Sequence, residues 1–141
     1  METKEKSIVV VETRINAPIE KVWKLWTTPD DIANWNNASD DWHTPHAEND
    51  LRAGGRFNYR MEARDGSMGF DFWGVYQRVI VNEYIEYIIG DDRKVKIDFI
   101  VNGHQTKITE SFEAENTNPV ELQRGGWQAI LDNFKKYAES E

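Results

Sequence analysis

Apolar and polar residues alternate along several stretches of this chain, as they do in strands that bury one face. Phe57 and Tyr59, for example, are separated and flanked by Arg56, Asn58 and Arg60. The first stretch is instead rich in β-branched residues, which also favour strands. Turn residues separate some of the stretches, at 65–66, 90–92 and 102–103. The pattern predicts six strands, at residues 7–15, 57–63, 68–76, 84–89, 95–101 and 106–114.

A different period predicts the helices. After Pro18, apolar residues recur three and four positions apart, which places them on one face of a helix. Pro29 ends this helix, because the residue before a proline is pushed out of the helical region. Residues 29–35 predict a second, short helix. A long helix follows Pro119, and its apolar stripe consists of Trp127, Ile130, Leu131, Phe134 and Ala138.

Two consecutive glycines, Gly125 and Gly126, lie near the start of this last helix. Inside a helix each glycine costs up to about 1 kcal/mol relative to alanine. Two explanations remain open at this stage: a neighbouring backbone or a ligand approaches closely, or the helix begins after the glycines.

Residues 36–50 follow neither period, and we predict no regular structure for them. They contain the sequence ASDDWH at 38–43, where two carboxylates adjoin an indole and an imidazole. Asp41 and His43 could act as an acid–base pair if burial shifted one of their pKa values. Together with His46 and Glu48 they could also serve as zinc ligands. However, nothing in the sequence fixes the convergent geometry that zinc requires, and no HExxH pattern occurs. We predict no metal site.

A structural role for the same segment is the stronger hypothesis. Trp42 would close the open end of a pocket, and His43 would cap the surrounding hydrogen-bond network. Asp40 and Asp41 would accept hydrogen bonds from loop N–H groups or pair with Arg52 or Arg56, because buried backbone groups need partners.

The order of elements is strand, helix, helix, five strands, helix. Short connections make the five consecutive strands an antiparallel meander, which needs a cover on one face. The long C-terminal helix is the natural cover. We therefore predict one α+β domain over residues 1–141, in which a curved antiparallel six-stranded sheet grips that helix. A gap is expected between sheet and helix near the two short helices.

Composition narrows the possible partners. The chain has 141 residues, no cysteine and a formal net charge of −8, so disulfides and thiolate chemistry are excluded. An acidic balance opposes binding to nucleic acid or to anionic membranes, both of which attract basic proteins. The charged N-terminus lacks the apolar core of a signal peptide, and no apolar run is long enough to span a bilayer. We expect a cytoplasmic protein.

Several motifs resemble those of a known superfamily. They are TRINAPIEKVW at 13–23, ASDDWH at 38–43, GGRF at 54–57, FDFWG at 70–74 and GWQAILDNF at 126–134. The chain resembles the SRPBCC superfamily, also called START-like or Bet v 1-like, and within it the group named after the C-terminal domain of the activator of Hsp90 ATPase. This resemblance implies a helix-grip fold and a cavity between sheet and helix that binds small apolar or aromatic molecules. Relatives include ligand carriers, polyketide cyclases, oxygenase domains and co-chaperone domains.

Aromatic residues form 12% of the chain and supply the candidate lining of that cavity. A void of roughly 400 Å³ would cost on the order of 10 kcal/mol, which equals the stability of a typical domain. A small domain therefore keeps such a void only if an occupant uses it; the alternative is that the rings fill the interior. The predicted ligand-binding residues are Trp35, Trp42, His43, Phe57, Tyr59, Phe70, Phe72, Tyr87, Phe99, Trp127 and Ile130.

Three functions fit these observations. The first is a binding protein for an apolar or aromatic molecule, in which Trp and Phe supply area and Tyr59, Tyr87 and His43 orient the ligand. The second is an enzyme of the cyclase or hydratase type, with Asp41 or His43 moving a proton. The third is a co-chaperone or other protein-interaction module with an acidic surface. No Walker, Rossmann or GxSxG motif is present, so we expect neither a nucleotide cofactor nor a serine nucleophile, and no cofactor at all.

Overall fold

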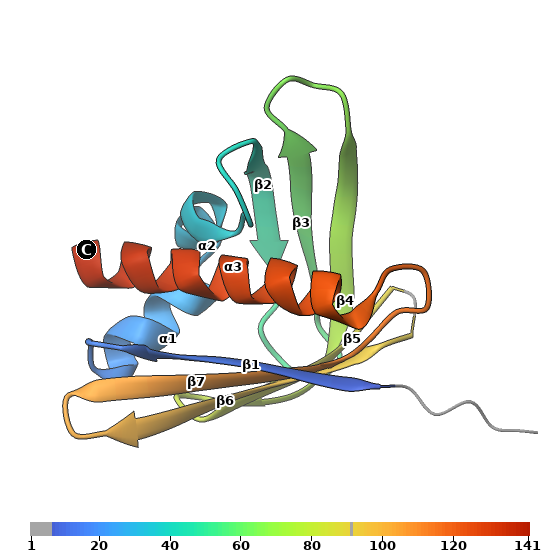
Figure 1. Cartoon of the computed structure of the whole chain (residues 1–141). Helices are drawn as coiled ribbons and strands as arrows, with labels where there is room; N and C mark the ends of the chain where they lie inside the picture. Colours follow the sequence, from blue (N-terminus) through green and yellow to red (C-terminus); the bar gives the residue numbers. More distant parts are fainter. Residues whose placement is uncertain (1–6, 91) are drawn as a thin grey trace, which may run out of the picture.

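The structure is a computed structural model, and it describes residues 7–90 and 92–141 (Figure 1). The charged N-terminal segment at 1–6 and Asp91 of the predicted turn lie outside the described residues. None of the three helices in the described chain combines the length and apolar character that crossing a bilayer requires. The elements are β1 (Ile8–Ile15), α1 (Ile19–Thr27), α2 (Pro29–Trp35), β2 (Trp42–Asn49), β3 (Arg56–Ala63), β4 (Gly69–Ile80), β5 (Tyr84–Ile89), β6 (Lys94–Asn102), β7 (Gln105–Glu113) and α3 (Val120–Ser140).

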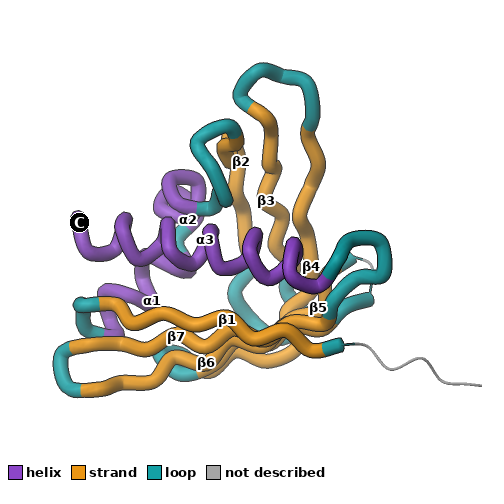
Figure 2. Tube along the Cα trace, in the orientation of Figure 1, coloured by secondary structure: helices purple, strands orange, loops and turns teal. Residues whose placement is uncertain are grey.

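All strands belong to one antiparallel sheet in the order β1-β7-β6-β5-β4-β3-β2. From β2 to β7, strands that are consecutive in sequence pair with each other, and β1 pairs with β7 at the opposite edge from β2. The sheet is strongly curved, so that β2, β3 and β4 run at a steep angle to β1, β6 and β7. The α3 helix crosses the concave side of the sheet (Figures 1 and 2). The predicted α+β helix-grip fold is confirmed.

The β2 strand corrects two predictions, because residues 36–50 are not all irregular and the sheet has seven strands rather than six. Trp42–Asn49 pairs with β3, and its register shifts between His43 and His46. Pro45 lies within this shift, where a residue without an N–H is tolerated. Since β2 is an edge strand whose polar side chains reach solvent, the alternation that would have predicted it is missing from the sequence.

Aromatic rings join the three helices to one another. The Trp26 ring of α1 lies 4.8 Å from the Trp35 ring of α2 and 4.8 Å from the Phe134 ring of α3. Trp35 and Phe134 are 4.9 Å apart in an edge-to-face arrangement. Such pairs contribute about 0.5–1.5 kcal/mol each beyond the area they bury. The cluster therefore fixes the position of α3 relative to the short helices.

Hydrogen bonds reinforce the same junction. The Trp35 indole N–H donates to the Leu25 carbonyl oxygen at 3.0 Å. The Asn133 side-chain amide donates to the Trp35 carbonyl oxygen at 2.8 Å and to Asn37 Oδ1 at 3.0 Å. A carbonyl in the last turn of α2, which has no partner within its own helix, thus obtains one from α3.

The two glycines of α3 are explained neither by close approach of a neighbouring backbone nor by a helix that begins after them, and approach of a ligand stays a prediction. The helix begins at Val120, before Gly125 and Gly126. A Cβ placed on either glycine would meet no atom within 4 Å. Neither glycine is therefore required by close packing inside the protein.

We predict that Gly125→Ala raises the free energy of unfolding by about 0.5–1 kcal/mol, because alanine has less conformational freedom in the unfolded chain. Urea unfolding followed by circular dichroism measures the change. Gly74→Ala is the matched control and should lower stability, since its Cβ would lie 2.7 Å from both the Ile88 carbonyl oxygen and the Phe57 ring. A loss of stability in Gly125→Ala would contradict the prediction.

Candidate functional site

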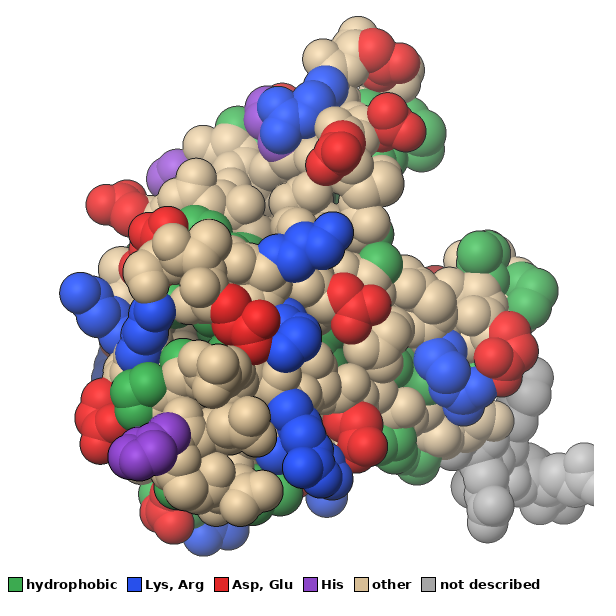
Figure 3. All heavy atoms as spheres, turned by 60° about the vertical axis from the view of Figure 1, so that its left-hand side comes forward, with side chains coloured by type: hydrophobic (Ala, Val, Ile, Leu, Met, Phe, Trp, Pro, Cys, Tyr) green, Lys and Arg blue, Asp and Glu red, His purple; other side chains and the backbone are tan. Residues whose placement is uncertain are grey.

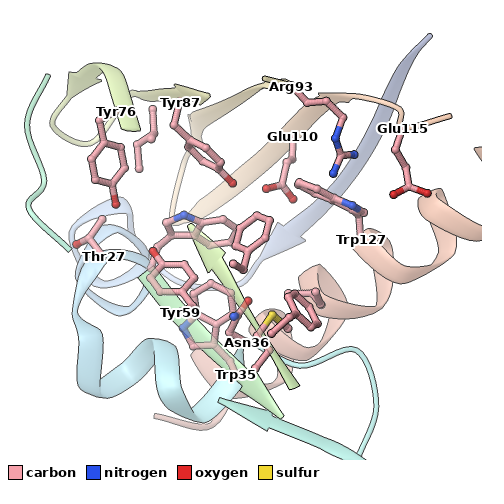
Figure 4. Close-up of a pocket in the computed structure, with 16 residues that line it drawn as sticks. Thr27, Trp35, Asn36, Tyr59, Tyr76, Tyr87, Arg93, Glu110, Glu115 and Trp127 are labelled. Carbon is pink, nitrogen blue, oxygen red and sulfur yellow. The ribbon is translucent and has the colours of Figure 1, made fainter. Parts of the chain in front are cut away.

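A pocket of about 330 Å³ lies where the helices face the concave side of the sheet (Figure 4). Rings and aliphatic side chains form most of its wall, and a few polar groups interrupt them. The α1 and α2 helices, α3 and strands β3, β4, β5 and β7 all contribute. The lining residues are Trp26, Thr27, Trp35, Asn36, Tyr59, Met61, Phe70, Phe72, Tyr76, Ile85, Tyr87, Arg93, Glu110, Glu115, Trp127 and Ile130.

Trp127 is the ring that α3 contributes at the β7 side of the pocket. It stacks on Phe112 of β7 with a centroid distance of 4.0 Å and an interplanar angle of 12°. It also forms an edge-to-face pair with Phe72 of β4, with the ring centroids 6.2 Å apart. These contacts hold one indole face against the sheet, so the orientation of the ring is fixed in the absence of any ligand.

Three tyrosines place hydroxyl groups in the pocket wall. Burial raises the pKa of Tyr59 and of Tyr87 well above the ordinary value, and it raises the pKa of Tyr76 to about 12. The charge of Glu110 raises the pKa of Tyr87 further. All three therefore stay protonated near neutral pH and can donate or accept a hydrogen bond.

Glu110 is the unusual group of this site. It lies on β7 between Val11 of β1 and Ile97 of β6, both apolar, and only 6% of its surface is exposed. Its carboxyl group points into the pocket, on the side where the Tyr87 hydroxyl also points (Figure 4). Burial alone raises its pKa to about 8, because no positive charge or hydrogen-bond donor among the described residues offsets the loss of water.

Four other polar lining groups are engaged with the protein itself. Thr27 donates its hydroxyl to the Trp23 carbonyl oxygen at 2.7 Å, and the Asn36 side-chain amide donates to Thr44 Oγ1 at 3.4 Å. Arg93 Nη1 donates to the Glu113 carbonyl oxygen at 3.2 Å, and Glu115 Oε1 accepts from the backbone N–H of Asn118 at 2.9 Å. Glu110 therefore differs from them in lacking a partner.

Most of the ligand-binding residues predicted from the sequence come together in the pocket wall. They are supplied by α2, by β3, β4 and β5, and by α3. Their binding role stays a prediction, while their position is now described. The predicted residues that line the pocket are Trp35, Tyr59, Phe70, Phe72, Tyr87, Trp127 and Ile130.

Four predicted residues lie outside the lining. Phe57, only 2% exposed, packs behind the wall against Tyr59, Phe72, Tyr76 and Tyr87. Phe99 packs edge-on against the indoles of α1. Trp42 lies on β2, where its ring is 5.9 Å from the Phe70 ring, so it contacts a lining residue and does not close the pocket itself. His43 follows it on β2 and is also absent from the wall.

The predicted network around the ASDDWH motif takes a different form. Asp40 and Asp41 are exposed, and their backbone carbonyl oxygens accept from Arg64, through Nε and through the backbone N–H, at 2.8 Å each. Arg52 instead pairs with Asp50 at 2.9 Å, and Arg56 lies over the Trp73 ring at 4.8 Å. The expected ion pairs of Asp40 and Asp41 are thus replaced by other local contacts. The two aspartates directly precede the edge strand β2 and are exposed there.

Sequence reasoning missed Glu110 and several other lining residues, although β7 carried a usable signal. In the stretch Thr106, Ile108, Glu110, Phe112 and Ala114, every second residue is buried. A glutamate at an inward position of an alternating strand indicates either a partner or a polar site. The others missed are Trp26, Thr27, Asn36, Met61, Tyr76, Ile85, Arg93 and Glu115.

The zinc arrangement considered for Asp41, His43, His46 and Glu48 does not form. Within residues 7–90 and 92–141, no three His, Asp or Glu side chains converge as metal ligands would. His46 Nε2 instead lies 3.5 Å from Glu48 Oε2 at the exposed sheet edge.

Comparison with known proteins gives the family. The sequence model of the family described as Activator of Hsp90 ATPase homolog 1-like protein matches residues 16–139. The chain belongs to this family. The superfamily resemblance drawn from the motifs is thereby confirmed. A search of curated proteins found no match.

Solved structures agree with this assignment. An AHSA1-like protein from Aeromonas hydrophila is 43% identical and has a TM-score of 0.90, over 95% of this chain and 93% of that one. A protein from Cytophaga hutchinsonii is 56% identical with a TM-score of 0.82, over 94% and 92% of the two chains. A protein of unknown function from Staphylococcus aureus, 18% identical over 96% of each chain, shares the fold with a TM-score of 0.69.

We predict that Glu110 makes stability depend on pH. The folded-state pKa is about 8 and the ordinary value is 4.5, so between these values the unfolded chain has lost a proton that the folded chain keeps. Its contribution is fully present below pH 4.5 and is lost as pH rises toward 8. Relative to Glu110→Gln, the wild type should lose about 1.4 kcal/mol of unfolding free energy per pH unit across this window.

Urea unfolding at several pH values between 5 and 8 measures the two profiles. Exposed Glu12 of β1 provides the control, since Glu12→Gln removes the same charge and should leave the wild-type slope intact. Parallel profiles for wild type and Glu110→Gln would contradict the assignment of a protonated, buried Glu110.

Proposed function

We propose that this protein binds a small apolar or aromatic molecule in the pocket between α3 and the curved sheet. The observation that carries the proposal is a pocket of about 330 Å³ whose wall is mainly aromatic and whose main polar feature is one unpartnered carboxyl group. A pocket of roughly 150 Å³ already accepts benzene in a protein core. The space here suits a molecule with two fused rings or an aliphatic chain of similar volume.

The energetic cost of the pocket supports the same proposal. At about 24 cal/mol per Å³, an unfilled space of 330 Å³ costs on the order of 8 kcal/mol. That cost is comparable with the total stability of an ordinary domain. The pocket opens to solvent and water lowers the cost, but burying a ligand of matching shape against Trp127, Phe72 and Tyr87 recovers more of it.

Proton transfer by Asp41 or His43 is less well supported, because neither side chain lines the pocket. A co-chaperone role, which the family description suggests, stays a prediction. It relied on an acidic surface, yet acidic and basic side chains are interspersed over the face drawn in Figure 3. The cytoplasmic location also stays a prediction. Ligand binding is the function that the geometry supports best.

We predict that naphthalene-based ligands quench tryptophan fluorescence with a saturable curve and that Trp127→Ala weakens their binding about tenfold, because it removes one wall of the pocket. Trp73→Ala is the control: Trp73 lies outside the pocket beneath Arg56, so affinity should be unchanged. Ile130→Phe, which fills space within the pocket, should weaken binding without removing a tryptophan.

Circular dichroism and urea unfolding establish that each variant is folded before binding is compared. The proposal fails if cationic, neutral and anionic naphthalenes all give no saturable quenching of the wild type. It also fails if Ile130→Phe and Trp127→Ala bind as tightly as the wild type does.

A further inference from the structure

We propose that the natural ligand of the pocket carries a basic nitrogen, and that the Glu110 carboxylate binds this nitrogen as a cation. This inference rests on the proposed function and deepens it by naming the class of ligand. It starts from an acidic side chain that is more than nine-tenths buried, faces the pocket and has no partner among the described residues.

No group among the described residues pairs with a charge on Glu110. Its strand neighbours across β1 and β6 are Val11 and Ile97, so neither directly paired side chain can donate a hydrogen bond to it. Arg93 lines the same pocket, but its Nη1 donates to the Glu113 carbonyl oxygen, and burial is the sole cause of the raised Glu110 pKa. A carboxyl group in such a position lowers stability at neutral pH, and an incoming cation would reverse that cost.

The remaining lining favours a cation over a neutral polar ligand. Tyr59, Tyr76 and Tyr87 already offer neutral hydroxyl groups, which suffice to orient an alcohol or a ketone. A carboxylate adds a negative charge that only a positive ligand group can use fully. Aromatic faces such as Trp127 attract cations as well, and the net charge of −8 favours the approach of a cation over that of an anion.

Binding would release a proton. Near neutral pH the free protein holds Glu110 as a carboxylic acid and the free amine is an ammonium ion. In the complex the ammonium N–H donates to the Glu110 carboxylate, so the carboxyl proton leaves to solvent and no other bond changes. As pH increases toward 8, the affinity for the amine should therefore increase by up to about tenfold per pH unit, because less free energy is needed to deprotonate Glu110. The other titratable groups of the pocket are Tyr59, Tyr76, Tyr87, Arg93 and Glu115.

The test compares 1-naphthylmethylamine, 1-naphthylmethanol and 1-naphthoic acid, which share one ring system and differ in charge. For the wild type at pH 7.5, we expect the amine to bind at least about tenfold more tightly than the alcohol. Glu110→Gln should abolish this preference. Glu12→Gln, which removes an exposed carboxylate, should preserve the preference.

A second measurement needs only the wild type. Calorimetric titration at pH 6.5 in buffers with different ionisation enthalpies should show about one proton released per amine bound and none per alcohol. This result does not depend on whether Glu110→Gln folds well.

The outcomes separate the two proposals. Equal affinity for amine and alcohol, a preference that survives Glu110→Gln, or amine binding without proton release overturns the inference and leaves ligand binding intact. Tightest binding of the acid also overturns it and indicates recognition by Arg93. If none of the three compounds binds, the proposed function fails and the inference fails with it.

Discussion

Contact between aromatic rings of α3 and the elements it crosses is the interaction on which the rest of this structure depends. Phe134 meets Trp26 and Trp35 at one end, and Trp127 stacks on Phe112 toward the other. Between these two contacts, Ile130 of α3 lines the pocket, whereas Leu131 is buried in the core. Trp26, Trp35 and Trp127 also line the pocket, so rings that hold the helix form part of its wall.

Glu110 lowers the stability of the folded protein near neutral pH and places a polar group in the pocket. At this inward place on β7 an apolar residue would add to the core, as Ile108 and Phe112 do on either side. The glutamate instead keeps a buried carboxyl group that favours the protonated state, since burial raises its pKa to about 8. Membership of the Activator of Hsp90 ATPase homolog 1-like family defines the fold around this group, whereas the proposed ligand class follows from the group itself.

The ASDDWH segment, which attracted most chemical hypotheses in the sequence, has a structural part in the folded protein. Trp42 begins β2 and packs against Phe70, while the backbone carbonyl groups of Asp40 and Asp41 bind Arg64. Clusters of chemically versatile residues are weak evidence of chemistry when nothing fixes their geometry. Here they stabilise the edge of the sheet, where an irregular strand with a proline needs local contacts.

The sequence by itself determined the helix-grip fold, because the period of apolar residues distinguishes strands from helices and the short connections between strands favour a meander. It also determined that rings such as Trp127 and Tyr59 face inward, since the apolar stripe of the last helix includes the first and strand alternation includes the second. Only the tertiary structure decided which rings border open space: Phe57 and Tyr59 occupy one strand, yet the first is covered by neighbours and the second lines the pocket. The local pattern of apolar and polar residues indicates which side chains are buried. A cavity depends instead on the distances between elements far apart in the chain, and no single stretch of sequence encodes those distances.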